Sequence, residues 1–334
     1  MEGFLHKSYF IKKGKVIITY AKKSFSLVEL AIVVMIAGVL SMVVIAGGMK
    51  LPTYAKSVSV INEISSYRQA INTFYNSIGG ENNETRYLPG DFPNAQYQLA
   101  PSGYQSYTNS QISGLSNAVY STIPLNGDGN GAVNATITCS SNVCSSEAFG
   151  VWSHLGAYGI IGKKYSNVCN SIRSNARNTC IKTDYNLPSV SNGEKNAVYT
   201  FFKPDLTNTM QKQIFGMFSD DKSFVNSHVL IMSDISYDKI YKSISTIGSY
   251  AFGGGGALRA DLMMMIDDKI DDGLPLTGNV LGINGTGTKG ACNNYEKDGT
   301  SFVAYGKNTE KSKIKYRNAG SNACIGAIVF GEFN

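Results

Sequence analysis

One stretch of the chain limits what the rest can form: from Leu30 to Met49 every side chain is apolar or small, and none is charged. A helix rises about 1.5 Å per residue, so roughly 20 such residues cross the ~30 Å hydrocarbon core of a membrane. A cleaved secretory signal is the alternative, but its apolar region is shorter and ends at a small-x-small cleavage site. We therefore predict a membrane-spanning helix.

The positive charge of the chain lies before this stretch. Residues 1–24 contain six lysines and one glutamate, which is +5 of the formal net charge of +6. Because lysine-rich flanks stay on the cytoplasmic side, we expect a cytoplasmic N-terminus and an exported C-terminal region. That region is close to neutral, so we expect no nucleic-acid partner.

All six cysteines follow the apolar stretch, where an oxidising compartment favours disulfides. They are Cys139, Cys144, Cys169, Cys180, Cys292 and Cys324. The spacing suggests nearest-neighbour pairs, 139–144, 169–180 and 292–324, although six cysteines allow about 15 pairings. Free buried thiols and a metal site are the alternatives, and the lack of a CxxC motif disfavours metal.

The helix is expected to continue beyond the membrane. Apolar residues recur at steps of three or four, which indicates one helix face: Val58, Ile61, Ile64, Tyr67, Ile71, Phe74 and Ile78. The polar residues Lys56, Glu63, Arg68 and Asn72 are predicted on the other side. Pro52, after Gly47 and Gly48, predicts a kink between the two halves, and Gly79-Gly80 predicts the helix end.

The remainder is typical of an exported α+β domain with an antiparallel sheet. Between Gln96 and Ser146 the only charged residue is Asp128, and Ser, Thr, Asn, Tyr and Gly dominate. Strands are predicted at 135–139, 198–203, 228–232 and 323–330, and helices at 147–161 and 257–271. The predicted divisions are a basic leader (1–24), a transmembrane helix (25–50), its amphipathic continuation (51–80) and a globular domain (81–334).

A single carboxylate, Glu29, lies at the edge of the apolar stretch, where a charge is costly and usually functional. Solvation at headgroup level is the plainer alternative. If the chain is cut after Ser24, the new α-amino group of Phe25 lies four residues from Glu29. A neighbouring copy's Glu29 could then pair with that amine in surroundings of low dielectric.

The stretch from Lys22 to Leu30, KKSFSLVEL, followed by the apolar run, resembles the type IV prepilin signature, which pseudopilins of type II secretion share. The resemblance implies cleavage between Ser24 and Phe25 by the prepilin peptidase, N-methylation of Phe25 and a role for Glu29 in assembly. The family usually has Gly where this chain has Ser24.

The function that the resemblance implies is structural: a pilin or minor pilin subunit of a type IV pilus or a type II secretion-like filament, not an enzyme. Its expected partners are the prepilin peptidase, other pilin subunits and the inner-membrane assembly platform. Its expected location is the inner membrane, with a periplasmic C-terminal domain, and then the filament. The alternative is a single-pass anchored adhesin or binding protein that never polymerises.

Downstream, the segments 88–95, 152–155 and 268–275 are similar to stretches of some pilin-like proteins, a weaker likeness than the N-terminal one.

Two acidic segments suggest cation sites. Asn126, Asp128 and Asn130 alternate as in the start of a calcium loop, with Gly131 sixth, but Ile137 stands where a bidentate Glu is expected. A plain Asn/Gly turn is the alternative. Four aspartates, Asp267, Asp268, Asp271 and Asp272, form either a solvated helix end or a second cation site. No catalytic residue and no other cofactor is predicted.

Overall fold

The protein is described by a computed structural model that divides into two compact units, Met1–Pro52 and Thr53–Asn334. The residues described are 6–12, 15–21, 27–48, 51–78, 86–99, 106–107, 120–121, 125–140, 143–170, 181, 183–193, 195–207, 211, 214–215, 218, 221–235, 254–285, 292–293, 314–317 and 322–333. For some residues within helices and strands only the backbone is described.

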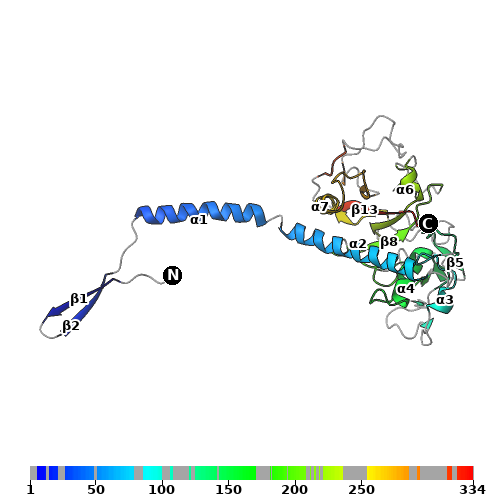
Figure 1. The fold of residues 1–334 in the computed structure, drawn as a ribbon. Helices are drawn as coiled ribbons and strands as arrows, with labels where there is room; N and C mark the ends of the chain where they lie inside the picture. Colours follow the sequence, from blue (N-terminus) through cyan, green and yellow to red (C-terminus); the bar gives the residue numbers. More distant parts are fainter. Residues whose placement is uncertain are drawn as a thin grey trace. The chain divides into compact units, whose positions relative to one another are not determined.

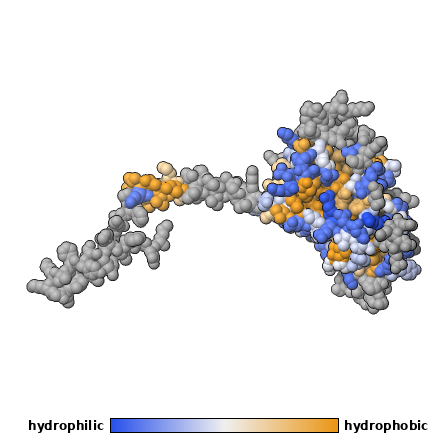
Figure 2. All heavy atoms as spheres, in the orientation of Figure 1, coloured by the Kyte–Doolittle hydropathy of each residue, from blue (hydrophilic) through white to orange (hydrophobic). Residues whose placement is uncertain are grey.

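The first unit consists of a hairpin and a helix (Figure 1). Strands β1 (His6–Lys12) and β2 (Lys15–Ala21) pair in antiparallel register, so residues predicted as a leader form strands. Helix α1 (Leu27–Gly48) follows, and residues 27–37 expose their side chains, which Figure 2 shows as a largely apolar surface. Within the described part of the chain, no helix has the length and apolar character that crossing a membrane requires.

Helix α2 (Leu51–Ser77) begins one residue before Pro52. Proline is tolerated in a first helical turn because the N–H groups there have no partner within the helix. This explains why a helix can begin here, in the region where the sequence predicts an interruption. Met49 and Lys50, between the two helices, lie outside the described residues, as does the predicted Gly79-Gly80 end.

The second unit is built on an antiparallel sheet in which β9 and β13 are central. Its long strands occur in the order β8 (Ala197–Phe202), β9 (His228–Asp234), β13 (Asn322–Gly331) and β12 (Val280–Asn284). Two short strands complete it: β10 (Gly255–Gly256) pairs with β9, and β11 (Leu258–Arg259) pairs with β13. The predicted antiparallel sheet and three of its four predicted strands are confirmed.

Helix α2 packs its apolar face against this sheet. Ile64, Ile71 and Phe74 are buried, as their spacing predicts. The half-buried ring of Tyr67 lies 5.0 Å from the ring of Tyr199 on β8, measured between centroids. Burial of such side chains gives about 1.5–3 kcal/mol each, so this face provides much of the attachment of the helix to the domain. The ring of Phe74 lies against Phe92 and His154, away from the sheet strands.

Two residues predicted on the polar side of α2 instead bind the domain. The Glu63 carboxylate accepts hydrogen bonds from the Tyr199 hydroxyl (2.8 Å) and from the backbone N–H of Ser191 (3.1 Å). The Arg68 guanidinium donates to the carbonyl oxygen of Val329 on β13 (3.1 Å). A strict division into apolar and polar faces fails here because polar groups are buried when they find partners.

The starts of the two longer helices after α2 have different local causes. Helix α4 (Glu147–Ala157) starts after Ser146, whose side chain accepts a hydrogen bond from the backbone N–H of Ala148. Helix α7 (Ala260–Ile270) starts three residues later than predicted, because Leu258 and Arg259 pair with β13 as a strand. The remaining described elements are α3 (Ala95–Gln98), β3 (Ser106–Tyr107), β4 (Tyr120–Ser121), β5 (Thr138–Ser140), β6 (Val143–Ser145), β7 (Val168–Asn170) and α6 (Lys222–Asn226).

The strand predicted at 135–139 is largely wrong, because only its last two residues belong to β5. The alternation of buried residues that suggested a strand is present, because Val133, Ala135 and Ile137 are buried. However, the nearby carbonyl of Val133 accepts from Lys203, and that of Asn134 accepts from Ala148. These groups bond to a loop and a helix start, so no continuous ladder forms.

The predicted disulfide between Cys292 and Cys324 is confirmed. Backbone pairing places Cys139 opposite Cys144, and Cys144 opposite Cys169, on the sheet β5–β6–β7. The side chains of these three cysteines, and all of Cys180, lie outside the described residues, so the other two pairings stay predictions.

We expect replacement of both Cys292 and Cys324 by Ser to lower the free energy of unfolding by about 2–4 kcal/mol, since the bond restricts the unfolded chain. Urea unfolding of the full-length protein in detergent micelles measures this. Reduction of the unaltered protein should also lower its urea unfolding midpoint. An unchanged midpoint in the double variant would contradict the expectation.

Candidate functional site

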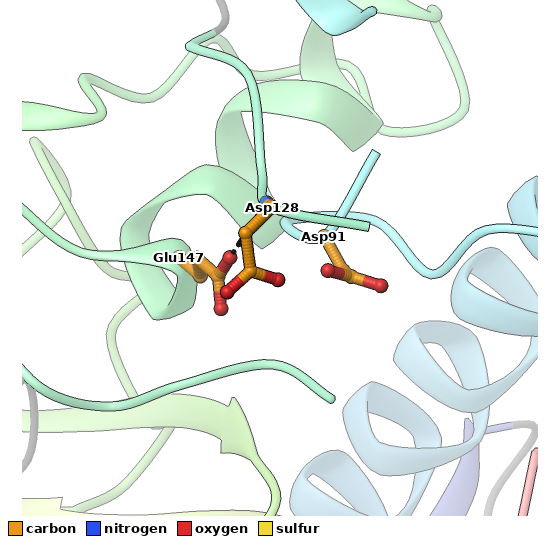
Figure 3. A group of neighbouring side chains, drawn as sticks. All are labelled: Asp91, Asp128 and Glu147. Atoms are coloured by element: carbon orange, nitrogen blue, oxygen red, sulfur yellow. Dashed lines mark hydrogen bonds between the residues drawn. The ribbon is translucent and has the colours of Figure 1, made fainter. Parts of the chain in front are cut away.

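Three segments bring carboxylates together beside helix α4. Asp91 comes from the segment 86–99, Asp128 from the loop 125–134, and Glu147 is the first residue of α4. One carboxylate oxygen of each lies within 4.8 Å of the others (Figure 3). We call these three residues the carboxylate cluster.

The loop of the carboxylate cluster is wrapped around Asp91. The Asp91 carboxylate accepts backbone N–H groups from Gly129 (2.8 Å), Asn130 (3.1 Å) and Gly131 (2.9 Å). Gly127 comes so close that an added Cβ would lie 2.3 Å from the backbone carbon of Asp91. The glycines of this loop therefore allow its backbone to approach Asp91 closely, as well as allowing the chain to turn.

Glu147 binds the same loop from the other side. Its two carboxylate oxygens accept the backbone N–H groups of Asp128 (3.1 Å) and Asn134 (2.8 Å). A glutamate in the first turn of a helix is also stabilised by the helix dipole. The side chains of Asp91 and Glu147 together accept five backbone N–H groups of the loop.

The electrostatics of the carboxylate cluster favour neutralisation. Burial, together with a hydrogen bond to Asp128 and the charge of Glu147, raises the pKa of Asp91 to about 7, against the lowering effect of its backbone donors. Burial also raises the pKa of Glu147. Neighbouring carboxylates of this kind hold either a proton or a cation.

The predicted calcium ligands are only partly brought together. Asp128 belongs to the carboxylate cluster, but the amide oxygen of Asn126 accepts the backbone N–H of Gln96 (2.9 Å). The amide oxygen of Asn130 accepts the backbone N–H of Ala132 (2.7 Å). Calcium binding by Asn126, Asp128 and Asn130 therefore stays a prediction.

The carboxylates themselves fit a hard cation. A carboxylate oxygen can accept about two hydrogen bonds. Asp91 Oδ1 accepts two from the backbone, whereas Asp91 Oδ2 and the two oxygens of Glu147 accept one each. The spare acceptor capacity is of the kind that Ca²⁺ uses. Sequence analysis missed Asp91 and Glu147, although Asp91 lies in one of the segments similar to pilin-like proteins.

The second group of aspartates holds a turn after α7. Asp267 is fully buried and accepts the Tyr316 hydroxyl (2.8 Å) and the backbone N–H of Gly273 (3.2 Å). Asp271 accepts the backbone N–H of Val280 (2.9 Å). Burial raises the pKa of Asp267 to about 7. Asp268 and Asp272 are exposed, as a helix end with a solvated face predicts, whereas Asp267 is buried. Carboxylate oxygens of Asp267, Asp271 and Asp272 lie within 4.8 Å of one another, so the second cation site stays a prediction.

The N-terminal residues predicted to function are described in part. Glu29 lies in the first turn of α1. Ser24 and Phe25 lie outside the described residues. Their predicted cleavage and methylation thus rest on the sequence.

We expect Asp91 to make the protein in metal-free buffer less stable as pH rises from about 4 to 7, an effect that the buried, neutral His154 opposes below about pH 6.5. The folded pKa of Asp91, about 7, lies above the unfolded value of about 4. Between these values the folded state holds a proton that the unfolded state has released, so stability falls as pH rises. Asp267 acts in the same direction.

Urea midpoints are measured with a chelator across this range for the unaltered protein and for the variant that combines Asp91→Asn with Asp267→Asn. The midpoint of the unaltered protein relative to that of the variant should fall as pH rises, and a relative midpoint that stays level or rises would contradict the expectation. Calcium added at pH 8 tests the calcium prediction, since a bound cation stabilises the folded state.

Comparison with models of protein families, with curated proteins and with solved structures finds no match for this chain.

Proposed function

We propose that the chain is a pilin-like subunit of a membrane-assembled filament of the type IV pilus or type II secretion kind. The observation that carries the proposal is the sequence KKSFSLVEL placed directly before an uncharged apolar run. A lysine pair, a cleavable position and a carboxylate in this order are a specific combination, whereas apolar runs alone are common.

The exposed side chains of α1 support an assembled state. Leu27, Val28 and Leu30 are 86%, 67% and 57% exposed. Apolar surface in water costs about 25 cal/mol for each Å², and contiguous exposed patches mark interaction surfaces. We propose that lipid covers this surface before assembly and that helices of neighbouring subunits cover it in the filament.

The fold of the second unit is consistent with the same role. A long helix, α2, packs one face on an antiparallel sheet and is fastened to it through Glu63 and Arg68. Such a helix resists being pulled from its domain, which a subunit under axial load requires. The α+β arrangement is also the one that the prepilin resemblance implies.

The proposed chemistry of assembly centres on Glu29. Cleavage after Ser24 gives Phe25 a cationic amine, and Glu29 of an adjacent copy neutralises it. In a core of apolar helices an unpaired carboxylate is costly, so the pair sets the register between subunits as well as attracting them.

The alternative function is a single-pass anchored adhesin or binding protein that does not polymerise. It uses the same apolar segment and needs no cleavage. The substitution of Ser24 for the usual Gly keeps this alternative open, and the two functions differ in the mature N-terminus and in the presence of filaments.

We expect the mature protein to begin at an N-methylated Phe25, which mass analysis of its N-terminal peptide can establish. Ser24→Gly should be processed at least as completely, and a bulky residue at 24 should block processing. An intact leader in the native membrane would contradict the proposal.

We expect Glu29→Ala to insert into the membrane normally and to be largely lost from sheared filaments. Removing one partner of a buried pair costs about 3–5 kcal/mol, which is more than a hundredfold in an equilibrium. Quantitative blotting of membrane and sheared fractions measures this. Glu332→Ala is the matched control, because Glu332 is an exposed glutamate that follows β13 in the second unit. Filament incorporation of Glu29→Ala at the normal level would contradict the pairing.

A further inference from the structure

A buried histidine lies at the centre of the segments that supply the carboxylate cluster. His154 is on α4, two helical turns after Glu147, so the two residues share a face of the helix. Its side chain is fully buried. Lone buried histidines often only fill space, so its hydrogen bonds decide whether it does more.

Both ring nitrogens of His154 bind backbone groups of other segments. Nδ1 accepts the backbone N–H of Gly90 (2.9 Å), and Nε2 lies 2.7 Å from the carbonyl oxygen of Leu125. An N–H can only donate and a carbonyl can only accept, so the proton is on Nε2 and the ring is neutral. Burial agrees with this, since it lowers the pKa of His154 to about 4.

The two backbone partners lie next to the other carboxylates. Gly90 directly precedes Asp91, and Leu125 begins the loop that carries Asp128. We propose that His154 is the positioning residue of the carboxylate cluster: one neutral imidazole joins the segments of Asp91 and Asp128 to the helix of Glu147. This inference does not depend on the proposed function of the chain.

The packing around His154 leaves little freedom for another arrangement. Gly90 has φ +93°, and an added Cβ would lie 2.5 Å from the carbonyl oxygen of Glu147. The ring of Phe74 on α2 stacks on the imidazole, with centroids 6.1 Å apart and planes 25° apart. The hydrogen bonds to Gly90 and Leu125 fix the orientation of the imidazole, and Phe74 fills the space beside it.

The test compares backbone amides in the full-length protein in detergent micelles. His154→Phe keeps a buried aromatic ring but removes both hydrogen bonds. We expect the amides of Gly129, Asn130 and Gly131, which Asp91 holds, to exchange with solvent at least about tenfold faster in this variant. A factor of ten corresponds to about 1.4 kcal/mol of local opening, the scale of one or two hydrogen bonds.

Matched variants separate positioning from general destabilisation. Phe74→Leu removes packing around His154 without removing either of its hydrogen bonds. In this variant the exchange rates of the amides of β9 and β13 measure the effect on the whole fold. His154→Gln keeps a donor and an acceptor and should restore part of the protection. Equal acceleration of loop and sheet amides in His154→Phe would overturn the proposal.

A measurement on the unaltered protein covers the case in which His154→Phe does not fold. With ¹⁵N labelling, a scalar coupling through the hydrogen bond should connect the Gly90 amide to Nδ1, and the nitrogen shifts should show the proton on Nε2. A proton found on Nδ1 would exclude the Gly90 bond and overturn the proposal.

Discussion

The rest of the domain depends on the contact between α2 and the antiparallel sheet. Ile64, Ile71 and Phe74 bury the apolar face of the helix, while Glu63 and Arg68 bond it to the domain and to β13. The apolar contacts are non-directional and the polar ones are directional. Together they set both the strength of the attachment and the rotation of the helix about its axis.

Carboxylates have an unusual structural role in this domain. Asp91, Glu147 and Asp267 are directed at backbone N–H groups or a tyrosine hydroxyl, so each replaces water as the partner of a donor. Burial makes a negative charge on each of them costly and raises their pKa values. The same geometry that orders the loops therefore creates sensitivity to protons and an affinity for cations.

The two proposals concern different parts of the molecule and different forces. The filament proposal rests on the sequence of residues 22–49 and on the exposed apolar side chains at the start of α1. The positioning proposal rests on contacts inside the domain, where His154 joins three segments. A filament subunit needs both, since assembly through the helix is useful only if the displayed domain keeps its shape.

Local patterns in the sequence by themselves determined α2, three strands of the sheet, the Cys292–Cys324 pair and the N-terminal signature. They did not reveal β1 and β2, and they placed Glu63 on the wrong side of α2. The carboxylate cluster and the role of His154 were decided only by the tertiary structure. The physical reason is the distance along the chain between the residues involved. Helix and strand periodicities relate residues a few positions apart. Gly90 and His154 are 64 residues apart and come into contact only after the chain has folded.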